Sequence, residues 1–311
     1  MTISTQKQSS RLQWLDVAKG ITIILMILGH TSIPGWLSNF IFAFHMPLFF
    51  IASGWCTNWA KDNYGAFLFK KLRTLGIPFL VYSVAVILIA RLAEFQDIGW
   101  CSVLANGWKG YALWFVPVLF FSLVVAKSIM CFISQKWLRY VICGMLILGG
   151  AILRYCHIYF PWTLATVPYA TFLILLGSSL RKFQEYIDKP RWLILIVSLL
   201  LTIVISQNWR MDLAWNCITP VIFLTLGAVA GTVMMFTFSS YLTKVSWPSI
   251  ILQVIGMETF VIMAFSQILC LAISHLFSCN KIIEYAIVFS LLLIIVLFKN
   301  GINKLLGNKI L

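Results

Sequence analysis

The sequence reads QWLDVAKGITIILMILGHT from Gln13 to Thr31. This run can cross a hydrocarbon core of about 30 Å as one helix, because a helix rises about 1.5 Å per residue. It nevertheless carries an acid, a base and an imidazole, which are Asp16, Lys19 and His30. Ionisable side chains are costly in lipid, so in membrane helices they mark functional positions by default.

Nine further apolar windows follow this one along the chain. They span residues 37–57, 74–93, 112–131, 137–155, 162–180, 191–207, 213–235, 249–273 and 283–299. The pattern predicts an all-α polytopic membrane protein with about ten transmembrane helices. The second window contains Pro47 and Gly54 among its apolar residues, and we expect a broken or tilted helix there, packed inside protein.

The composition excludes an ordinary soluble domain. Of the 311 residues, 61% are hydrophobic and 10% charged, against about 45–50% and about 25% in soluble domains. No stretch is polar enough for a separate folded unit, so residues 1–311 are expected to form one transmembrane domain without an appended soluble domain. The eight cysteines are typical of small apolar packing residues, although Cys101 and Cys279 could pair.

The charge balance of +14 would favour nucleic acid as the partner of a soluble protein. In a membrane protein it reflects orientation instead, because Lys and Arg stay on the cytoplasmic side. Seventeen of the 23 basic residues lie between windows on one side and five on the other, with Lys19 inside the first window. This split predicts cytoplasmic N- and C-termini and contacts with anionic membrane lipids, not nucleic acid.

The polar residues of the first window share one face. Lys19 and His30 are eleven residues apart, which places them about 16 Å apart along one stripe and about 20° out of line. Asp16 precedes Lys19 by three residues, so the two can neutralise each other within the helix. The alternatives are a charge pair at the lipid headgroups and a histidine satisfied by a neighbouring helix. A neutral imidazole can act as base or nucleophile.

The second window supplies another histidine, His45, in the run from Phe44 to Phe50. Two histidines on consecutive antiparallel helices can meet. A metal site would need a third ligand, and the sequence offers none of the right kind, so no metal is expected. The pair Ser53-Gly54 favours close contact with another helix.

A basic cluster precedes the third window. It contains Lys70, Lys71 and Arg73, and it is either an orientation signal or a site for a cytosolic phosphorylated ligand, with the planar fork of Arg73 as its best phosphate contact. Trp114 fits an interfacial belt or a sugar platform, and Arg154 fits a sugar contact or a helix end.

In combination, these motifs resemble the membrane-bound acyltransferase-3 family, whose members acylate extracytoplasmic sugars in bacteria. The resemblance covers nearly the whole chain. It rests on the following elements: the spacing of Lys19 and His30, the run 44–50 with Ser53-Gly54, the pair Lys70 and Arg73 before Pro78, Leu113-Trp114-Phe115, and Leu175-Leu176-Gly177. The chain departs from the family in having Lys19 where Arg is common and Ser266-Gln267 where a histidine is common.

The resemblance implies an acyl-CoA donor, most simply acetyl-CoA, entering from the cytosol with its phosphates near the basic cluster. The acyl group would pass inward along the first two helices to a hydroxyl of a cell-surface polysaccharide or lipid-linked sugar, such as O-antigen, common antigen or capsule. The location implied is the bacterial inner membrane. The resemblance implies that His30 is the base or a transient acyl carrier, that Asp16 and Lys19 position it, and that His45 is the second choice. It also implies that acyl-CoA is bound by Lys70, Lys71 and Arg73. The acceptor would be bound by Trp114 and Arg154.

Two other functions fit the same sequence. A carrier that flips a lipid-linked sugar would also use ten helices and a polar stripe, without acyl-CoA or a new ester. A structural subunit of a polysaccharide export complex would tolerate the loss of either histidine.

Overall fold

The computed structural model describes residues 12–31, 33–93, 112–189, 191–277 and 281–305. Within these ranges the chain is helical apart from short connections, and the only β-type pairing is an isolated bridge between Asp212 and Cys217. The long helices are α1 (Gln13–Gly29), α2 (Gly35–Cys56), α4 (Ile77–Leu92), α6 (Phe115–Phe132), α7 (Lys136–Tyr155), α8 (Val167–Leu180), α10 (Trp192–Asn208), α11 (Val221–Leu242), α12 (Ser246–Met257), α13 (Thr259–Leu276) and α14 (Lys281–Leu305). The short ones are α3 (Tyr64–Lys71), a π-helical turn η1 (Leu72–Gly76), η2 (Ala112–Trp114), η3 (Pro161–Thr166), η4 (Arg181–Phe183), α9 (Gln184–Asp188) and η5 (Leu213–Trp215).

Eight helical segments of the described residues are long and apolar enough to cross a membrane. This confirms the all-α polytopic fold. Every predicted window contains a helix, but α1 and α10 have 17 residues each and fall short of the length of the other eight. The window 249–273 is not one helix, because the chain breaks at Glu258 into α12 and α13.

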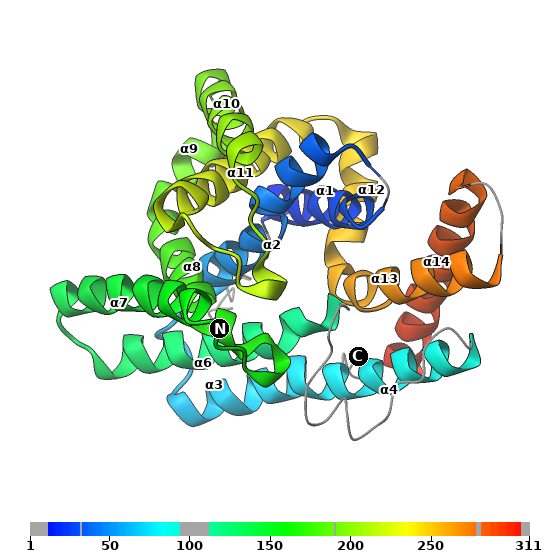
Figure 1. Ribbon diagram of the computed structural model, residues 1–311, viewed down its shortest axis with the longest axis horizontal. Coiled ribbons are helices and arrows are strands. Elements are labelled where there is room, and N and C mark those ends of the chain that lie inside the picture. The colour runs from blue at the N-terminus through cyan, green and yellow to red at the C-terminus, as the bar shows by residue number, and fades with distance from the viewer. Residues whose placement is uncertain (1–11, 32, 94–111, 190, 278–280, 306–311) are drawn as a thin grey trace, which may run out of the picture.

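Of the two forms expected for the second helix, broken or tilted, the broken one is wrong. Helix α2 runs without interruption for 22 residues with Pro47 inside it. Proline removes one backbone donor, and tightly packed neighbouring helices compensate for such losses in membrane proteins. The expected burial is confirmed, since α2 lies at the centre of the bundle while α7, α10 and α14 lie at its edge (Figure 1).

Backbone contact between α2 and α8 explains the close packing predicted at Ser53-Gly54. A Cβ atom on Gly54 would lie 1.8 Å from the carbonyl oxygen of Ile174, and one on Gly177 would lie 2.0 Å from that of Ile51. Only glycine permits this approach, and the two contacts fix α8 against α2.

Close backbone contact at glycine residues also joins α1 to α12. A Cβ atom on Gly20 would lie 2.1 Å from the Leu252 carbonyl oxygen, and one on Gly256 would lie 1.8 Å from that of Asp16. Helix α12 therefore packs directly on the turn that carries Asp16 and Lys19. At the edge of the bundle, α7 exposes apolar side chains such as Leu148 and Ile152, as a lipid-facing helix does.

Six cysteines of the described residues are free thiols. The predicted pairing of Cys101 with Cys279 falls outside the described residues.

Candidate active site

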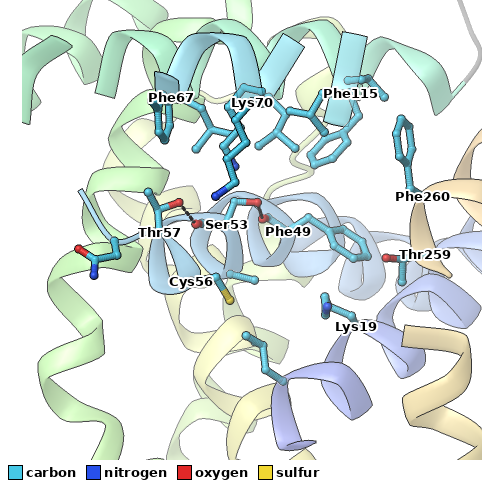
Figure 2. A pocket seen from close by; sticks show the side chains of 18 of the residues that line it. Lys19, Phe49, Ser53, Cys56, Thr57, Phe67, Lys70, Phe115, Thr259 and Phe260 are labelled. Carbon is cyan, nitrogen blue, oxygen red and sulfur yellow. Dashed lines mark hydrogen bonds between the residues drawn. The ribbon is translucent and has the colours of Figure 1, made fainter. Parts of the chain in front are cut away.

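A pocket of about 610 Å³ lies between α1, α2, α3, α6 and the start of α13. We call it the basic pocket, because five cations line it: Lys19, Lys61, Lys70, Lys71 and Arg181. Figure 2 shows Lys70 and Phe115 entering it from the side opposite Lys19 and Cys56. Its volume is in the range of a small-molecule site.

Two of these cations have a carboxylate partner. Nζ of Lys19 lies 2.7 Å from Oδ1 of Asp16, which confirms the pair predicted from their spacing. Asp16 is buried, so the pair is not the headgroup pair that the sequence left open. Nζ of Lys70 lies 3.4 Å from Oδ2 of Asp62.

The other three cations are not compensated in this way. Within the part of the chain that the structure describes, no carboxylate lies within ion-pair distance of Lys61, Lys71 or Arg181. Three cations around one pocket, with a single lining carboxylate, Asp62, form a site for an anion. Arginine and lysine are the usual contacts of phosphate groups.

Much of the remaining wall is apolar. Phe49, Phe115, Leu119 and Met263 line it, and the rings of Phe49 and Phe115 lie 6.0 Å apart. The Cys56 thiol also lines this pocket and is exposed. The pocket therefore suits a ligand with an anionic part and an apolar part.

The two histidines lie elsewhere, around a second and much smaller cavity of about 30 Å³. We call it the histidine cavity. His30, His45, Trp114 and Asp212 all line it, and it has room only for a water-sized group. The rings of His30 and His45 are 6.4 Å apart, and both lie edge-on to Phe42. The predicted meeting of the two histidines is confirmed.

The hydrogen bond of His45 defines its tautomer. Its Nδ1 lies 3.0 Å from the carbonyl oxygen of Ile41. A carbonyl oxygen only accepts, so Nδ1 carries the hydrogen and Nε2 retains its lone pair. His45 is buried, whereas His30 is exposed at the end of α1.

A loop before α11 closes the histidine cavity. Arg210 stacks on Phe42 at 4.3 Å and donates to Ser38 and Asn39 at the start of α2. Asp212 accepts the amide hydrogen of Ala214, and burial raises the pKa of its carboxyl group. Arg210 thus holds a positive charge next to the two histidines, a role that sequence reasoning missed.

Among the described residues, no residue lines both cavities. Helix α1 lines the basic pocket through Lys19 and the histidine cavity through His30. Helix α2 does the same through Phe49 and His45. Lys19 and His30 therefore line different cavities, and the described residues outline no single channel that contains both.

Two neighbouring aromatic side chains lie where the two cavities adjoin. Trp114 lines the histidine cavity and Phe115 lines the basic pocket, and their rings are 6.2 Å apart at nearly a right angle. They are the last residue of η2 and the first of α6.

Three of the predicted site residues lie outside both cavities. Asp16 pairs with Lys19 but lines neither cavity. Arg73 is exposed on η1 and does not line the basic pocket. Arg154 donates to the hydroxyl of Tyr159 at 3.2 Å and does not line the histidine cavity. Lys70 and Lys71 do line the basic pocket, and Trp114 joins the histidines.

Lys61 and Arg181 are the cations of the basic pocket that sequence reasoning missed, because they were counted only as connecting-loop charges. The sequence spacing does indicate the position of Arg181. It follows Gly177 by four residues, about one helical turn, and so lies just beyond the end of α8 on the side of the helix that carries Gly177. Gly177 faces α2, and that face leads to the basic pocket.

The fold and the site define a class: a multi-pass membrane protein that combines an anion-binding pocket with a separate pair of histidines. A family model described as an acyltransferase domain, that of the acyltransferase-3 group, matches residues 12–299. The chain belongs to this membrane acyltransferase family. No curated protein and no solved structure matches it.

Proposed function

We propose that the chain transfers an acyl group, most simply acetyl, from acyl-CoA in the basic pocket to a sugar hydroxyl near the histidine cavity. The observation that carries this proposal is the set of three uncompensated cations, Lys61, Lys71 and Arg181, beside an apolar wall. Coenzyme A combines phosphate groups with a long uncharged thioester arm, so both parts of the pocket have a matching part of the ligand.

The predicted orientation of the protein in the membrane supports the same ligand. The excess of Lys and Arg on one side of the predicted helices predicts that these cations face the cytoplasm, where acyl-CoA is made. The acceptor then comes from the opposite side, as a lipid-linked or surface glycan of the bacterial inner membrane.

In the reaction the sugar oxygen attacks the thioester carbonyl carbon, the C–S bond breaks, and coenzyme A leaves as the thiol. His30, exposed and at the acceptor side, takes the hydroxyl proton, and the coenzyme A thiolate takes up one proton in turn. In the alternative route a ring nitrogen of His30 attacks the thioester and coenzyme A leaves; the sugar oxygen then attacks the acyl-imidazole and the imidazole is released. Lys19, held by its ion pair with Asp16, lines the pocket that takes the donor. The thioester end has to pass Phe115 and Trp114 to reach His30.

Mass spectrometry of surface glycan tests this function. Cells without the gene, restored with either the wild-type gene or His30→Ala, are compared. We expect an added acetyl group only with the wild-type gene, and release of free CoA thiol from acetyl-CoA by wild-type membranes. Glycan that reaches the surface in smaller amount but without a mass change would favour the flippase instead.

A further inference from the structure

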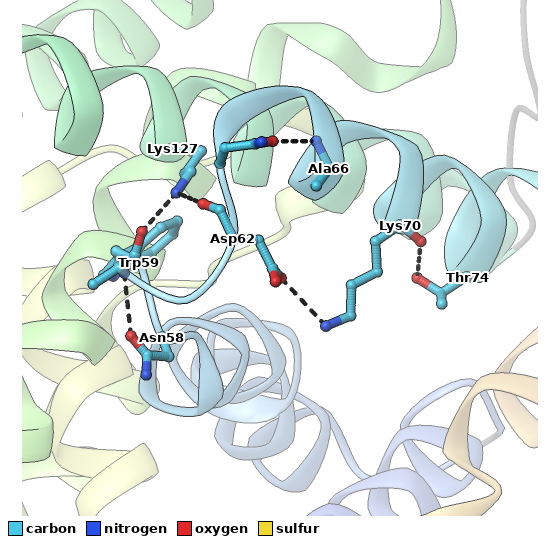
Figure 3. A network of polar contacts seen from close by, with 9 residues as sticks. Asn58, Trp59, Asp62, Ala66, Lys70, Thr74 and Lys127 are labelled. Atoms are coloured by element: carbon cyan, nitrogen blue, oxygen red, sulfur yellow. Dashed lines mark hydrogen bonds and ion pairs between the residues drawn. The ribbon is translucent and has the colours of Figure 1, made fainter.

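The most deeply buried cation of the described residues lies beside the basic pocket, not in it. Lys127, in α6, is 2% exposed. Its Nζ donates to the carbonyl oxygens of Trp59 at 2.6 Å and Asp62 at 2.7 Å (Figure 3). A buried charge is costly unless it is well bonded, and no carboxylate of the described residues lies within ion-pair distance of this one.

The two carbonyl groups belong to the connection between α2 and α3, residues 57–63. This connection forms one wall of the basic pocket through Asn58, Lys61 and Asp62. The Asp62 carboxylate in turn contacts Lys70, another cation of the pocket. The backbone that Lys127 holds therefore determines where Lys61 and Lys70 lie.

The connection has few other ties to the bundle. The indole of Trp59 donates to Ser178 of α8 at 2.8 Å. The Asn58 side chain bonds only within the connection, to the amide of Ala60. Lys127 thus bonds the backbone of this wall to α6, while Tyr64, the first residue of α3, bonds to Ser128 of α6 at 3.1 Å through its side chain. The Lys127 ammonium also lies 5.5 Å from the ring of Phe67, which lines the same pocket.

We propose that Lys127 is a positioning residue for the acyl donor: by holding the carbonyls of Trp59 and Asp62, it keeps Lys61 and Lys70 directed at the donor phosphates. This inference rests on the proposed function, because it takes the anionic ligand to be a CoA thioester. An ammonium suits this task, since it offers several donors and no acceptor to two carbonyl oxygens.

A matched control lies at the other end of the following loop. Arg139 also holds carbonyl groups, those of Ile133 at 2.7 Å and Met130 at 3.3 Å, between α6 and α7. None of these residues lines the basic pocket. Arg139→Met therefore removes a similar cationic clamp without touching the wall of the pocket.

The test measures KM for acetyl-CoA, kcat and thermal stability of the purified protein. Lys127→Met should raise KM about tenfold while kcat changes less than about twofold, since the loss is in donor binding. Lys127→Arg, which keeps the charge and the donors, should bring KM back to within about threefold of the wild type. Arg139→Met should lower the melting temperature similarly and leave KM unchanged.

A second readout is independent of turnover. The CoA concentration that half-protects Cys56 from a thiol reagent should rise by the same factor in Lys127→Met. If that variant does not accumulate, Lys127→Gln, which removes the charge and places an acceptor beside its two N–H donors, carries the same test.

An unchanged KM in folded Lys127→Met would overturn the inference, as would an equal rise in Arg139→Met or the absence of recovery in Lys127→Arg. A wild-type protein that neither binds CoA nor releases it from acetyl-CoA would contradict the proposed function itself, so the two failures are distinct.

Discussion

The imidazole rings of His30 and His45 lie 6.4 Å apart at an interplanar angle of 87°, one exposed at the end of α1 and the other buried inside α2. The arrangement divides their roles. His45 is held by its bond to Ile41, whereas the exposed His30 is the one that the proposed function assigns to the incoming hydroxyl.

His30→Ala should lower acyl transfer by about 10²–10⁴-fold, the usual contribution of a general base. The side chain lies beyond the last residue of α1, so the protein should still fold and insert normally. Transfer to glycan is followed by mass spectrometry, and insertion by size-exclusion chromatography in detergent. His157→Asn is the control, because His157 lines neither cavity and has a positive φ that asparagine tolerates. Wild-type transfer by His30→Ala would exclude this histidine as the base.

Arg181→Gln should raise KM for acetyl-CoA by about tenfold or more, because a charge-assisted hydrogen bond contributes about 1.5–3 kcal/mol. The exposed Arg73, which lies outside the basic pocket, should have a smaller effect as Arg73→Gln. Initial rates over a range of donor concentrations compare the two. A larger KM in Arg73→Gln would return the donor phosphates to the cluster indicated by the sequence.

Coenzyme A should slow the modification of Cys56 by a maleimide several-fold. The thiol lines the basic pocket, so a bound ligand covers it. The measurement uses a variant that keeps Cys56 and has serine at the other cysteines. A variant that keeps only Cys131, which is exposed and outside the pocket, should react equally with and without CoA. Equal reactivity of Cys56 under both conditions would argue against CoA in this pocket.

Gly54→Ala should destabilise the protein by about 1–3 kcal/mol or more, because the added methyl group would lie 1.8 Å from the Ile174 carbonyl oxygen and the helices would have to separate. Gly149→Ala is the matched control, since no atom lies within 4 Å of the added Cβ. Glycine costs about 0.5–1 kcal/mol relative to alanine within a helix, so this change should be neutral or stabilising. Thermal unfolding in detergent compares them, and an equally stable Gly54→Ala would show that α2 and α8 can part without cost.

Much of the fold could be predicted because it depends on local properties. Hydropathy along the chain predicts the helices, and the i,i+3 spacing of Asp16 and Lys19 predicts their ion pair. The unbroken course of α2 through Pro47 could not be predicted in this way, because neighbouring helices decide it.

The site was harder to predict where it depends on contacts between distant segments. In the sequence alone, Lys127 cannot be distinguished from the other basic residues that orient the helices. Its role depends on the packing of α6 against the connection between α2 and α3, where it binds the carbonyl groups of Trp59 and Asp62. The two separate cavities were also not predictable, because the spacing of Lys19 and His30 gives their common stripe but not the residues of other helices that line a cavity with each of them.

The aromatic boundary at Trp114 and Phe115 has a consequence for the cell. A water-filled passage from one face of the bilayer to the other would conduct protons and dissipate the membrane potential. In the proposed function, the donor anion and the acceptor hydroxyl each enter their own cavity, with the contacting rings of Trp114 and Phe115 where the cavities adjoin. Acyl transfer would then need no open water-filled passage across the energised membrane.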